Sequence, residues 1–431
     1  MQSKPYTKYK PSGIEWLGDV PEHWEVKKLK QTMSLITKKS NAETQNVALE
    51  NIESWSGKYI PSDTEFDGDG VTFQVGDILF GKLRPYLAKA YLAEFHGAAV
   101  GDFHVMRPIM MHLHGRYILY LILNKEVISL IDGSTFGAKM PRVNWEFMAN
   151  IPIPLPTLPE QQAIADFLDR ETGHIDALIA KKKSLLSLLA EQRTALISRA
   201  VTKGLNPSVK LKPSGVEWLG DVPEHWDVKK LKHVTNFFGR IGFRGYTTDD
   251  LVAEGDGAIT LSPSNMKKGE LNLEKCTYIS WEKYYESPEI MIKRNDVVIV
   301  KTGSTFGKIS FVRDIDHPIT LNPQIAVFKN VRCNSRFFFF YVTAPYIQDQ
   351  ISLSNTGSTI PTMTQQTILS YAIPLPPLPE QQAIADFLDC ETAKIDTLSA
   401  KVQTAIERLK EYRTALISAA VTGKIDVREA V

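Results

Sequence analysis

The sequence predicts a mixed α/β protein with a pseudo-two-fold internal repeat, in which two globular domains are separated by two long antiparallel helices forming a coiled coil. Three observations carry this prediction. A frame of sequence occurs twice in nearly identical form, each copy encloses an insert of its own, and each insert precedes a segment with heptad spacing. Because copies of one frame fold into similar halves, we expect these halves to pack about an approximate two-fold axis.

The frame consists of blocks that repeat almost letter for letter. KPSGIEWLGDVPEHWEVKKLK at Lys10–Lys30 recurs at Lys212–Lys232 with conservative changes only, and LPEQQAIADFLD is identical at Leu158–Asp169 and Leu378–Asp389. Each Pro-Glu-His-Trp segment holds one histidine with no second ligand nearby, which is poor evidence for a metal site or acid–base chemistry. We therefore expect the frame tryptophans to pack against the frame: Trp16, Trp24, Trp218 and Trp226.

Each insert is followed by a proline-rich hinge and then by a long helix. Pro159 and Pro379 suit the first turn of a helix, and the glutamates that follow them complement the positive end of the helix dipole. The second helix has an apolar residue at every seventh position and a companion seam beside it, whereas polar residues interrupt the same pattern in the first. The stripe of the second helix comprises Leu388, Ile395, Val402, Leu409 and Leu416, with Ile384, Leu398, Ala405 and Tyr412 as companions; the first helix offers Leu168, Ile175, Leu189 and Leu196, with Ile164, Leu178 and Leu185.

The inserts, Gln31–Thr157 and His233–Pro377, show no comparable match to each other. In both, a strand–turn–strand pattern precedes a helical one, at residues 71–95 and 116–131 in the first insert and at 289–312 and 336–352 in the second. Both inserts are therefore expected to be mixed α/β modules. Unlike inserts on a like frame would face one target at two places and bind different features of it.

Composition narrows the class of protein. A chain of 431 residues with 43% hydrophobic content is typical of globular proteins with two or three domains. The polar start and the short apolar runs predict neither a signal peptide nor a membrane span, so we expect a cytoplasmic protein. Three scattered cysteines indicate neither a disulfide framework nor a zinc site. A net charge of +1 does not indicate a nucleic-acid binder, unless basic residues gather on one face.

Catalytic motifs are not found in the sequence. The segment Gly303–Ile309, GSTFGKI, resembles a phosphate-binding loop but has the wrong glycine spacing, and isoleucine stands where the magnesium-binding hydroxyl would be. We interpret it as a hairpin turn that approaches DNA phosphate. An Asn-Pro-Pro-aromatic turn of an amino-methyltransferase is missing, as are nuclease and helicase signatures.

Several turns combine cations with aromatic or hydroxyl side chains. Such groups suit contact with phosphate oxygens and base edges, although a solvated surface loop would have a similar composition. The candidate nucleic-acid contacts are Lys82, Arg84, Tyr86, Lys89, Lys139 and Arg142 in the first insert, and Arg240, Arg244, Tyr246, Lys301, Ser304, Thr305 and Lys308 in the second.

Taken together, these motifs resemble the DNA-specificity subunit of type I restriction-modification systems. The resemblance rests on SGIEWLGDVPEHW…KKL, IPLPPLPEQQAIADFLD, GDILFGKLRPYL and the closing RTALIS…AVTGKIDVR, and it spans essentially the whole chain. It implies that each insert is a target-recognition domain that reads one half of a split DNA sequence. It also implies that the helices are a spacer that docks two adenine methyltransferase subunits.

The resemblance fixes the expected domain boundaries and partners. Residues 1–157 would form the first target-recognition domain, 158–206 the central spacer helix, 207–377 the second target-recognition domain and 378–431 the C-terminal spacer helix. The chain would bind double-stranded DNA and be non-catalytic, with no cofactor or metal of its own. S-adenosylmethionine would act on the methyltransferase partners, and ATP with magnesium on restriction and translocase subunits.

Two alternatives belong to other classes of protein. A self-sufficient DNA-modifying enzyme would need a cofactor-binding turn and a catalytic motif, and binding of labelled cofactor by the isolated chain would support it. A coiled-coil scaffold without DNA readout would explain the helices and the neutral charge, but it gives the divergent inserts no purpose. A gel shift with a random DNA pool separates the scaffold from the reader.

Overall fold

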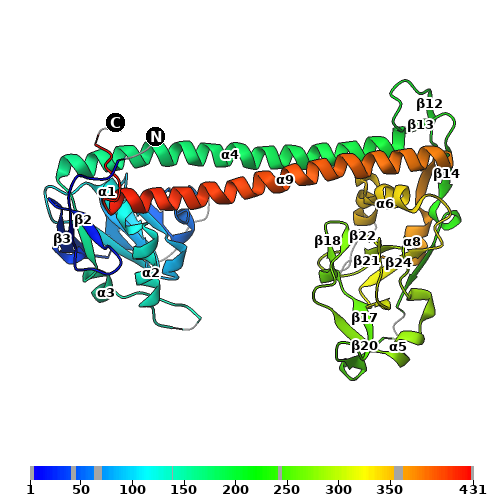
Figure 1. Cartoon of the computed structure of the whole chain (residues 1–431), viewed down its shortest axis with the longest axis horizontal. Coiled ribbons are helices and arrows are strands. Elements are labelled where there is room, and N and C mark those ends of the chain that lie inside the picture. The colour runs from blue at the N-terminus through cyan, green and yellow to red at the C-terminus, as the bar shows by residue number, and fades with distance from the viewer. Residues whose placement is uncertain are drawn as a thin grey trace. The chain divides into compact units, whose positions relative to one another are not determined.

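Figure 1 shows the computed structural model of the chain, which describes residues 4–39, 45–62, 70–137, 139–240, 245–353 and 363–428. The chain divides into two compact units. Unit 1 comprises Met1–Ser184 and Val402–Val431, and unit 2 comprises Leu185–Lys401. Each unit therefore contains one insert, one copy of the frame and a part of both long helices.

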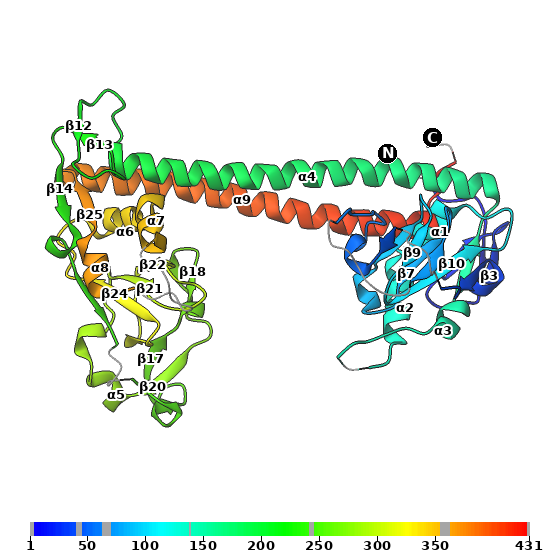
Figure 2. The same ribbon diagram turned by 180° about the vertical axis from the view of Figure 1, so that it is seen from behind.

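Unit 1 is built on two small sheets, seen in Figure 2 around β7, β9 and β10. The larger sheet is antiparallel, and both sheets share a core of alternating strand residues that includes Leu79 and Val105. The larger sheet has the order β4 (Met33–Ile36), β10 (Phe103–Pro108), β7 (Ile78–Gly81), β8 (Ala90–Leu92), and the smaller the order β5 (Asn46–Val47), β9 (Gly97–Ala99), β6 (Val71–Phe73).

Unit 2 repeats this plan with added strands. The order β15, β24, β21, β22 matches β4, β10, β7, β8 of unit 1, and a parallel pair, β17–β23, matches β5–β9. The two inserts therefore share one fold although their sequences do not match. The larger sheet runs β15 (Asn236–Gly239), β24 (Ile325–Lys329), β21 (Val297–Val300), β22 (Ile309–Phe311), β19 (Glu270–Leu271), β18 (Met266–Lys267), and the second runs β16 (Leu251–Val252), β20 (Thr277–Ser280), β17 (Gly257–Leu261), β23 (Ile319–Leu321).

The helix predicted in each insert is a pair of shorter helices. In unit 1 the break falls at Asn124, whose side chain caps the second helix by accepting from the N–H groups of Glu126 and Val127. In unit 2 it falls before Pro345, which has no N–H to continue the first helix. The pairs are α1 (Gly115–Ile122) with α2 (Lys125–Gly133), and α6 (Ser335–Thr343) with α7 (Pro345–Leu353); α3 (Trp145–Ala149), α5 (Trp281–Tyr285) and α8 (Gln365–Ser370) complete the inserts.

The frame forms the same strand pairs in both units. A short hairpin comes first, and the next strand of the frame pairs with the proline-rich hinge beyond the insert, which is extended as its prolines predict. The hairpins are β1 (Tyr9–Pro11) with β2 (Asp19–Pro21) and β12 (Leu211–Pro213) with β13 (Asp221–Pro223), and the hinge pairs are β3 (Glu25–Lys28) with β11 (Pro152–Leu155) and β14 (Asp227–Lys230) with β25 (Ala372–Leu375).

The Pro-Glu-His-Trp segment joins the frame to the first turn of a long helix. In unit 1, Trp24 is completely buried, and its Nε1–H donates to Glu160 Oε1 over 3.4 Å. His23 Nε2 lies 2.9 Å from the same oxygen. Burial alone would raise the pKa of Glu160, but hydrogen bonds from His23, Thr157 and Trp24 hold it below its usual value. The second copy repeats the joint, with Glu380 Oε2 2.8 Å from His225 Nε2 and 3.1 Å from Trp226 Nε1.

The predicted packing of the frame tryptophans is confirmed for Trp24 and Trp226, which are fully buried. Trp16 and Trp218 are half-buried.

The long helices, α4 (Leu158–Lys203) and α9 (Leu378–Val421), run antiparallel to each other within each unit. In unit 1, Arg413 Nε donates to Asp176 Oδ1 over 3.0 Å, and in unit 2, Arg193 Nε donates to Asp396 Oδ1 over 3.1 Å. Asp176 and Asp396 hold the same place in the repeated helix, and so do the two arginines. The two ion pairs are therefore repeat equivalents, as the predicted pseudo-two-fold repeat requires.

The heptad stripe is confirmed more fully than its companion seam. Leu168, Leu189, Leu388 and Leu416 are buried as predicted. Among the companions, Ile164 and Ile384 are buried as predicted, whereas Leu178, Leu185, Leu398 and Tyr412 are exposed. Ile179 and Ile406, one position along from predicted places, are buried instead. The reason is that 3.6 residues per turn carry a straight helix out of strict heptad phase.

The two ends of the described chain lie together in unit 1. The Tyr9 hydroxyl donates to Gly423 O over 3.0 Å, and the Asp426 N–H donates to Lys4 O over 2.8 Å. Gly423 has φ +71°, and a Cβ there would lie 2.5 Å from Pro21 Cδ, so this position requires glycine. In unit 2, Gly204 with φ +75° lies one position further along the repeat, directly after α4, and the chain continues from it into the second frame hairpin.

None of the helices in the described part of the chain is long and apolar enough to cross a membrane.

Candidate nucleic-acid interface

Two loops that the sequence singles out separately occupy equivalent places in the two units. Lys82–Lys89 connects β7 to β8, and Lys301–Lys308 connects β21 to β22. Each loop starts from the same backbone pattern. The N–H of its lysine donates to the residue just before the neighbouring strand, over 2.9 Å to Asp102 O before β10 in unit 1 and over 2.8 Å to Gln324 O before β24 in unit 2. The structure therefore brings these candidate residues to matching positions on matching sheets.

The loop of unit 1 is held in an unusual backbone conformation. Arg84 and Ala88 have φ of +50° and +47°, a region that non-glycine residues rarely adopt, on either side of the tight turn Pro85–Leu87. This conformation presents the exposed side chains of Arg84 and Tyr86. Lys89 is not presented in this way, because its Nζ donates to Leu49 O over 2.6 Å and so fastens the base of the loop.

A second loop lies directly beside Arg84. Phe136 and Arg142 exchange backbone hydrogen bonds of 3.1 and 3.0 Å, and the Arg84 N–H donates to Pro141 O over 2.8 Å. The guanidinium of Arg142 binds both carboxylate oxygens of Asp102, at 3.1 and 2.8 Å, and these bonds raise the pKa of Arg142. Lys82 Nζ lies 3.8 Å from the same carboxylate. Lys82 and Arg142 thus neutralise Asp102, and Lys139 is exposed nearby on the second loop.

The loop of unit 2 presents hydroxyl groups at its tip. Ser304 and Thr305 are exposed between Gly303 and Gly307, whose φ values of +102° and +81° allow the chain to turn. The flanking lysines face protein carbonyls: Lys308 Nζ donates to Pro263 O over 3.2 Å, and Lys301 Nζ donates to Arg240 O over 3.4 Å. Burial lowers the pKa of Lys301.

Arg240 differs from the sequence-based expectation of a DNA contact. It is 3% exposed, its Nε donates to Leu321 O over 2.9 Å, and its guanidinium carbon lies 5.6 Å from the ring centroid of the half-buried Tyr246. A backbone carbonyl, the Thr320 hydroxyl and a ring face contact this cation inside the unit. Arg240 therefore supports the loop of Lys301 from within. The predicted contact Arg244 lies outside the described residues.

Tertiary structure adds two candidates that sequence reasoning missed. Phe136 and Met140 are 58% and 49% exposed on the loop beside Arg84. Exposed apolar side chains next to cations suit contact with bases as well as phosphates. The only sequence signal was their closeness to Lys139 and Arg142, because the contact with Arg84 joins residues far apart in the chain.

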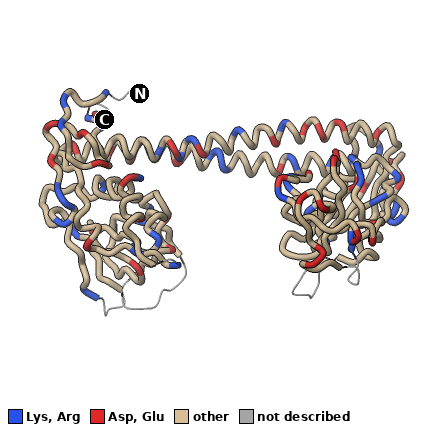
Figure 3. The backbone as a smooth tube through the Cα atoms, turned by 60° about the horizontal axis from the view of Figure 1, so that its bottom comes forward, with Lys and Arg blue, Asp and Glu red and all other residues tan. Residues whose placement is uncertain are grey.

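Positive and negative residues are interspersed in the described part of the chain, and the positive ones do not gather on one face (Figure 3). Figure 3 shows Lys and Arg interspersed with Asp and Glu in both units and along the helices. No group of three or more His, Cys, Asp or Glu residues in the described ranges is placed to hold a metal ion. The arrangement offers small cationic, hydroxyl-bearing and aromatic loops at the ends of rigid strands, which suits binding to a charged polymer.

Comparison with known proteins identifies relatives over nearly the whole chain. The sequence profile described as type I restriction modification DNA specificity domain matches residues 21–187 and 223–408. The type I restriction enzyme MjaVIII specificity subunit of Methanocaldococcus jannaschii is 26% identical over 426 residues, which cover 95% of this chain and 94% of that protein. The EcoBI specificity subunit of Escherichia coli is 22% identical over 310 residues, covering 69% of this chain and 63% of that protein.

Two solved structures share the fold. A chain from work on the complex assembly and conformational transition of the type I R-M system has a TM-score of 0.71 at 18% identity, covering 94% of this chain and 99% of that one. The HsdS subunit from Thermoanaerobacter tengcongensis has a TM-score of 0.54 at 17% identity, covering 94% and 98%.

Proposed function

Because the chain belongs to the type I restriction-modification DNA specificity family, we propose that it is the sequence-reading subunit of a type I restriction-modification complex. Each insert binds one half of a bipartite site in double-stranded DNA. The proposal is supported above all by one observation: two inserts without sequence similarity share one strand order and present equivalent loops. A common scaffold with different loop chemistry is what two readers of different sequences require.

The exposed loop residues make the DNA contacts in this proposal. Arg84 and Lys139 provide charge in unit 1, with Tyr86 beside them, and Ser304 and Thr305 provide hydroxyls in unit 2. The remaining described candidates serve as supports or secondary contacts: Lys82, Lys89 and Arg142 in unit 1, and Arg240, Tyr246, Lys301 and Lys308 in unit 2. Arg244 stays a proposed DNA contact on its sequence alone.

The helices dock the partner subunits. Leu178 and Leu398 hold the same place in the repeated helix, and both side chains are largely exposed, at 47% and 45%. Equivalent apolar positions suit two copies of one partner, which are two methyltransferase subunits in this proposal. Those subunits use S-adenosylmethionine, restriction subunits use ATP, and this chain contributes binding and positioning in the cytoplasm, where the DNA of the cell lies.

Mapping methylated adenines in the host genome, with the gene present and deleted, tests the proposed function. Loss of methylation at one bipartite sequence on deletion is the expected result. A methylome that deletion leaves unchanged, together with no retardation of a random DNA pool by the subunit in complex with its partners, would instead favour the coiled-coil scaffold.

Substitution in the equivalent loops tests the proposed contacts. Arg84→Ala is expected to weaken DNA binding by about 1–3 kcal/mol with relaxed specificity if the side chain meets a base, or equally on all sequences if it meets phosphate. Lys301→Ala should weaken binding as well, because it removes the support of the second loop. Fluorescence anisotropy at several salt concentrations measures both effects.

Arg294→Ala is the control for these substitutions. Arg294 is an exposed arginine whose segment leads into β21 at the end opposite the loop, and it pairs weakly with Asp314 at 3.6 Å. Unchanged affinity and salt dependence in both loop variants would remove these loops from the interface.

A further inference from the structure

We propose that Arg413 of α9 is a positioning residue for the reading loop Lys82–Lys89, acting through the backbone of Trp55, and that it sharpens discrimination at the half-site of unit 1 alone. The inference rests on the proposed function, because it requires this loop to meet DNA. A residue of a long helix would thus take part in the discrimination of DNA sequence by one insert.

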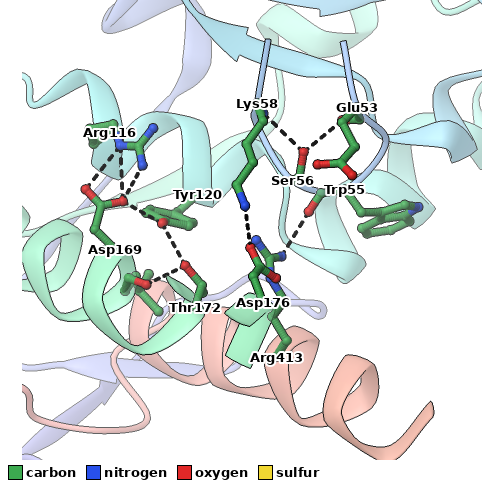
Figure 4. A network of polar contacts seen from close by, with 11 residues as sticks. Glu53, Trp55, Ser56, Lys58, Arg116, Tyr120, Asp169, Thr172, Asp176 and Arg413 are labelled. Atoms are coloured by element: carbon green, nitrogen blue, oxygen red, sulfur yellow. Dashed lines mark hydrogen bonds and ion pairs between the residues drawn. The ribbon is translucent and has the colours of Figure 1, made fainter. Parts of the chain in front are cut away.

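Arg413 joins the helix pair to the first insert by two different bonds, drawn in Figure 4. Its Nε donates to Asp176 Oδ1 over 3.0 Å, and one terminal nitrogen donates to Trp55 O over 3.0 Å. Lys58 Nζ donates to the other oxygen of Asp176 over 2.8 Å. The Arg413 side chain is only 11% exposed, so water competes little for these bonds. Segment 53–58 of the insert is thus fastened to both long helices.

The same segment continues to the reading loop. The Trp55 N–H donates to Ala88 O over 3.0 Å, and the Ala88 N–H donates to Pro85 O over 2.8 Å. The backbone of Trp55 therefore accepts a hydrogen bond from α9 at its carbonyl oxygen and donates one from its N–H to the loop that presents Arg84 and Tyr86. Helix α9 is linked to the loop through two hydrogen bonds and one residue.

The bridging segment is rigid enough to transmit position. Trp55 has φ +64°, a conformation that a non-glycine residue holds only when its surroundings impose it. The Glu53 N–H donates to Lys58 O over 3.0 Å, and the Ser56 hydroxyl donates to Glu53 O over 3.2 Å. A Cβ at Gly57 would lie 2.9 Å from Leu119 Cδ2, so the turn is packed closely on α1.

A neighbouring ion pair between an insert helix and a long helix occurs in both units. Arg116 of α1 binds Asp169 of α4, and the Tyr120 hydroxyl donates to the same carboxylate over 2.6 Å (Figure 4). Unit 2 repeats the arginine–aspartate part with Arg336 and Asp389. This anchor fixes an insert helix in both units and cannot distinguish the two readers.

The two repeat-equivalent arginines of the long helices, by contrast, make different contacts in the two units. Arg193 holds the place of Arg413 in the repeat and donates to Asp396 over 3.1 Å. Within the residues that the structure describes, the Arg193 guanidinium makes no hydrogen bond to the second insert, and the side chains of Arg193 and Asp396 are 35% and 58% exposed. The chain therefore carries its own matched control for the link through Trp55.

Arg413→Lys and Arg193→Lys, each in the full chain assembled with its methyltransferase subunits, test the proposal. Lysine retains the charge beside the aspartate, but a single ammonium lacks the two separated donors of the guanidinium. Methylation rates are measured on duplexes that carry one substituted base pair in either half-site. Hydrogen exchange of peptides covering 53–60 and 82–92 is measured in the same complexes without DNA.

Arg413→Lys is expected to speed exchange in both peptides and to reduce discrimination at the first half-site by about tenfold, the scale of one good base contact, with the second half-site unchanged. Arg193→Lys should alter neither half-site. Unchanged exchange in 82–92, or an equal loss at both half-sites, overturns the role of Arg413. Faster exchange with full discrimination overturns instead the proposed function of the loop. If Arg413→Lys does not assemble, Arg413→Gln, which retains a donor and loses the charge, is measured in the same way against Arg193→Gln.

Discussion

Replacing Gln31–Thr157 by the corresponding insert of a relative is expected to change one half of the methylated sequence completely and leave the other half intact. The physical reason is that the reading loop and both small sheets of unit 1 lie within this insert, and that Arg413 and Asp176, which fasten it from the long helices, stay in place. Methylome mapping of the chimaera in a host that lacks the native gene measures the outcome. If both halves changed, or if neither did, the idea of two independent readers would be wrong.

The strand pairing supplies a control for this exchange. The insert ends with β11, which pairs with the frame strand β3, so a full exchange also replaces one half of a frame contact. A second chimaera that keeps residues 151–157 native retains this pair. It should give the same new half-site, and a difference between the chimaeras would show that the hinge takes part in readout. Exchange of His233–Pro377 should change the opposite half.

Trp24→Ala is expected to destabilise unit 1 by about 3–5 kcal/mol, the usual cost of a large cavity in a core. Trp24 is fully buried, and its loss also removes a donor from the buried Glu160. Hydrogen exchange resolved by peptide checks the prediction: protection should fall in residues 4–39 and 415–428 and persist in 211–239. Trp226→Ala is the matched variant and should produce the reverse pattern. Equal loss of protection in both units after either substitution would contradict independent frame joints.

The frame was the most predictable part of the molecule because its sequence occurs twice. Repetition located the tryptophan joints and the starts of both long helices, and proline and glutamate at the first helical turn followed from local chemistry. The shared strand order of the inserts was not predictable, because strand pairing depends on contacts between distant residues that leave no common sequence pattern.

Some residues of the candidate site were likewise predictable from the sequence, and others were not. Arg84, Tyr86, Ser304 and Thr305 are exposed on equivalent loops, and their side-chain chemistry and turn signals were visible in the sequence. The burial of Arg240 was not, because a cation in a glycine-rich turn looks the same in sequence whether carbonyls or solvent surround it. Trp55 gave no signal at all, since only its backbone participates.

The two ion pairs of the long helices are exchanged between the two copies of the repeat. Aspartate of the first copy binds arginine of the second, and aspartate of the second copy binds arginine of the first. Such reciprocal exchange is the signature of an isologous interface, in which one self-complementary surface serves two identical subunits. The contact of residues 4–9 with 423–428, where unit 2 has continuous chain, completes the same correspondence. The two copies in this chain therefore meet through the long helices as two identical subunits of a dimer would, with one self-complementary surface used twice.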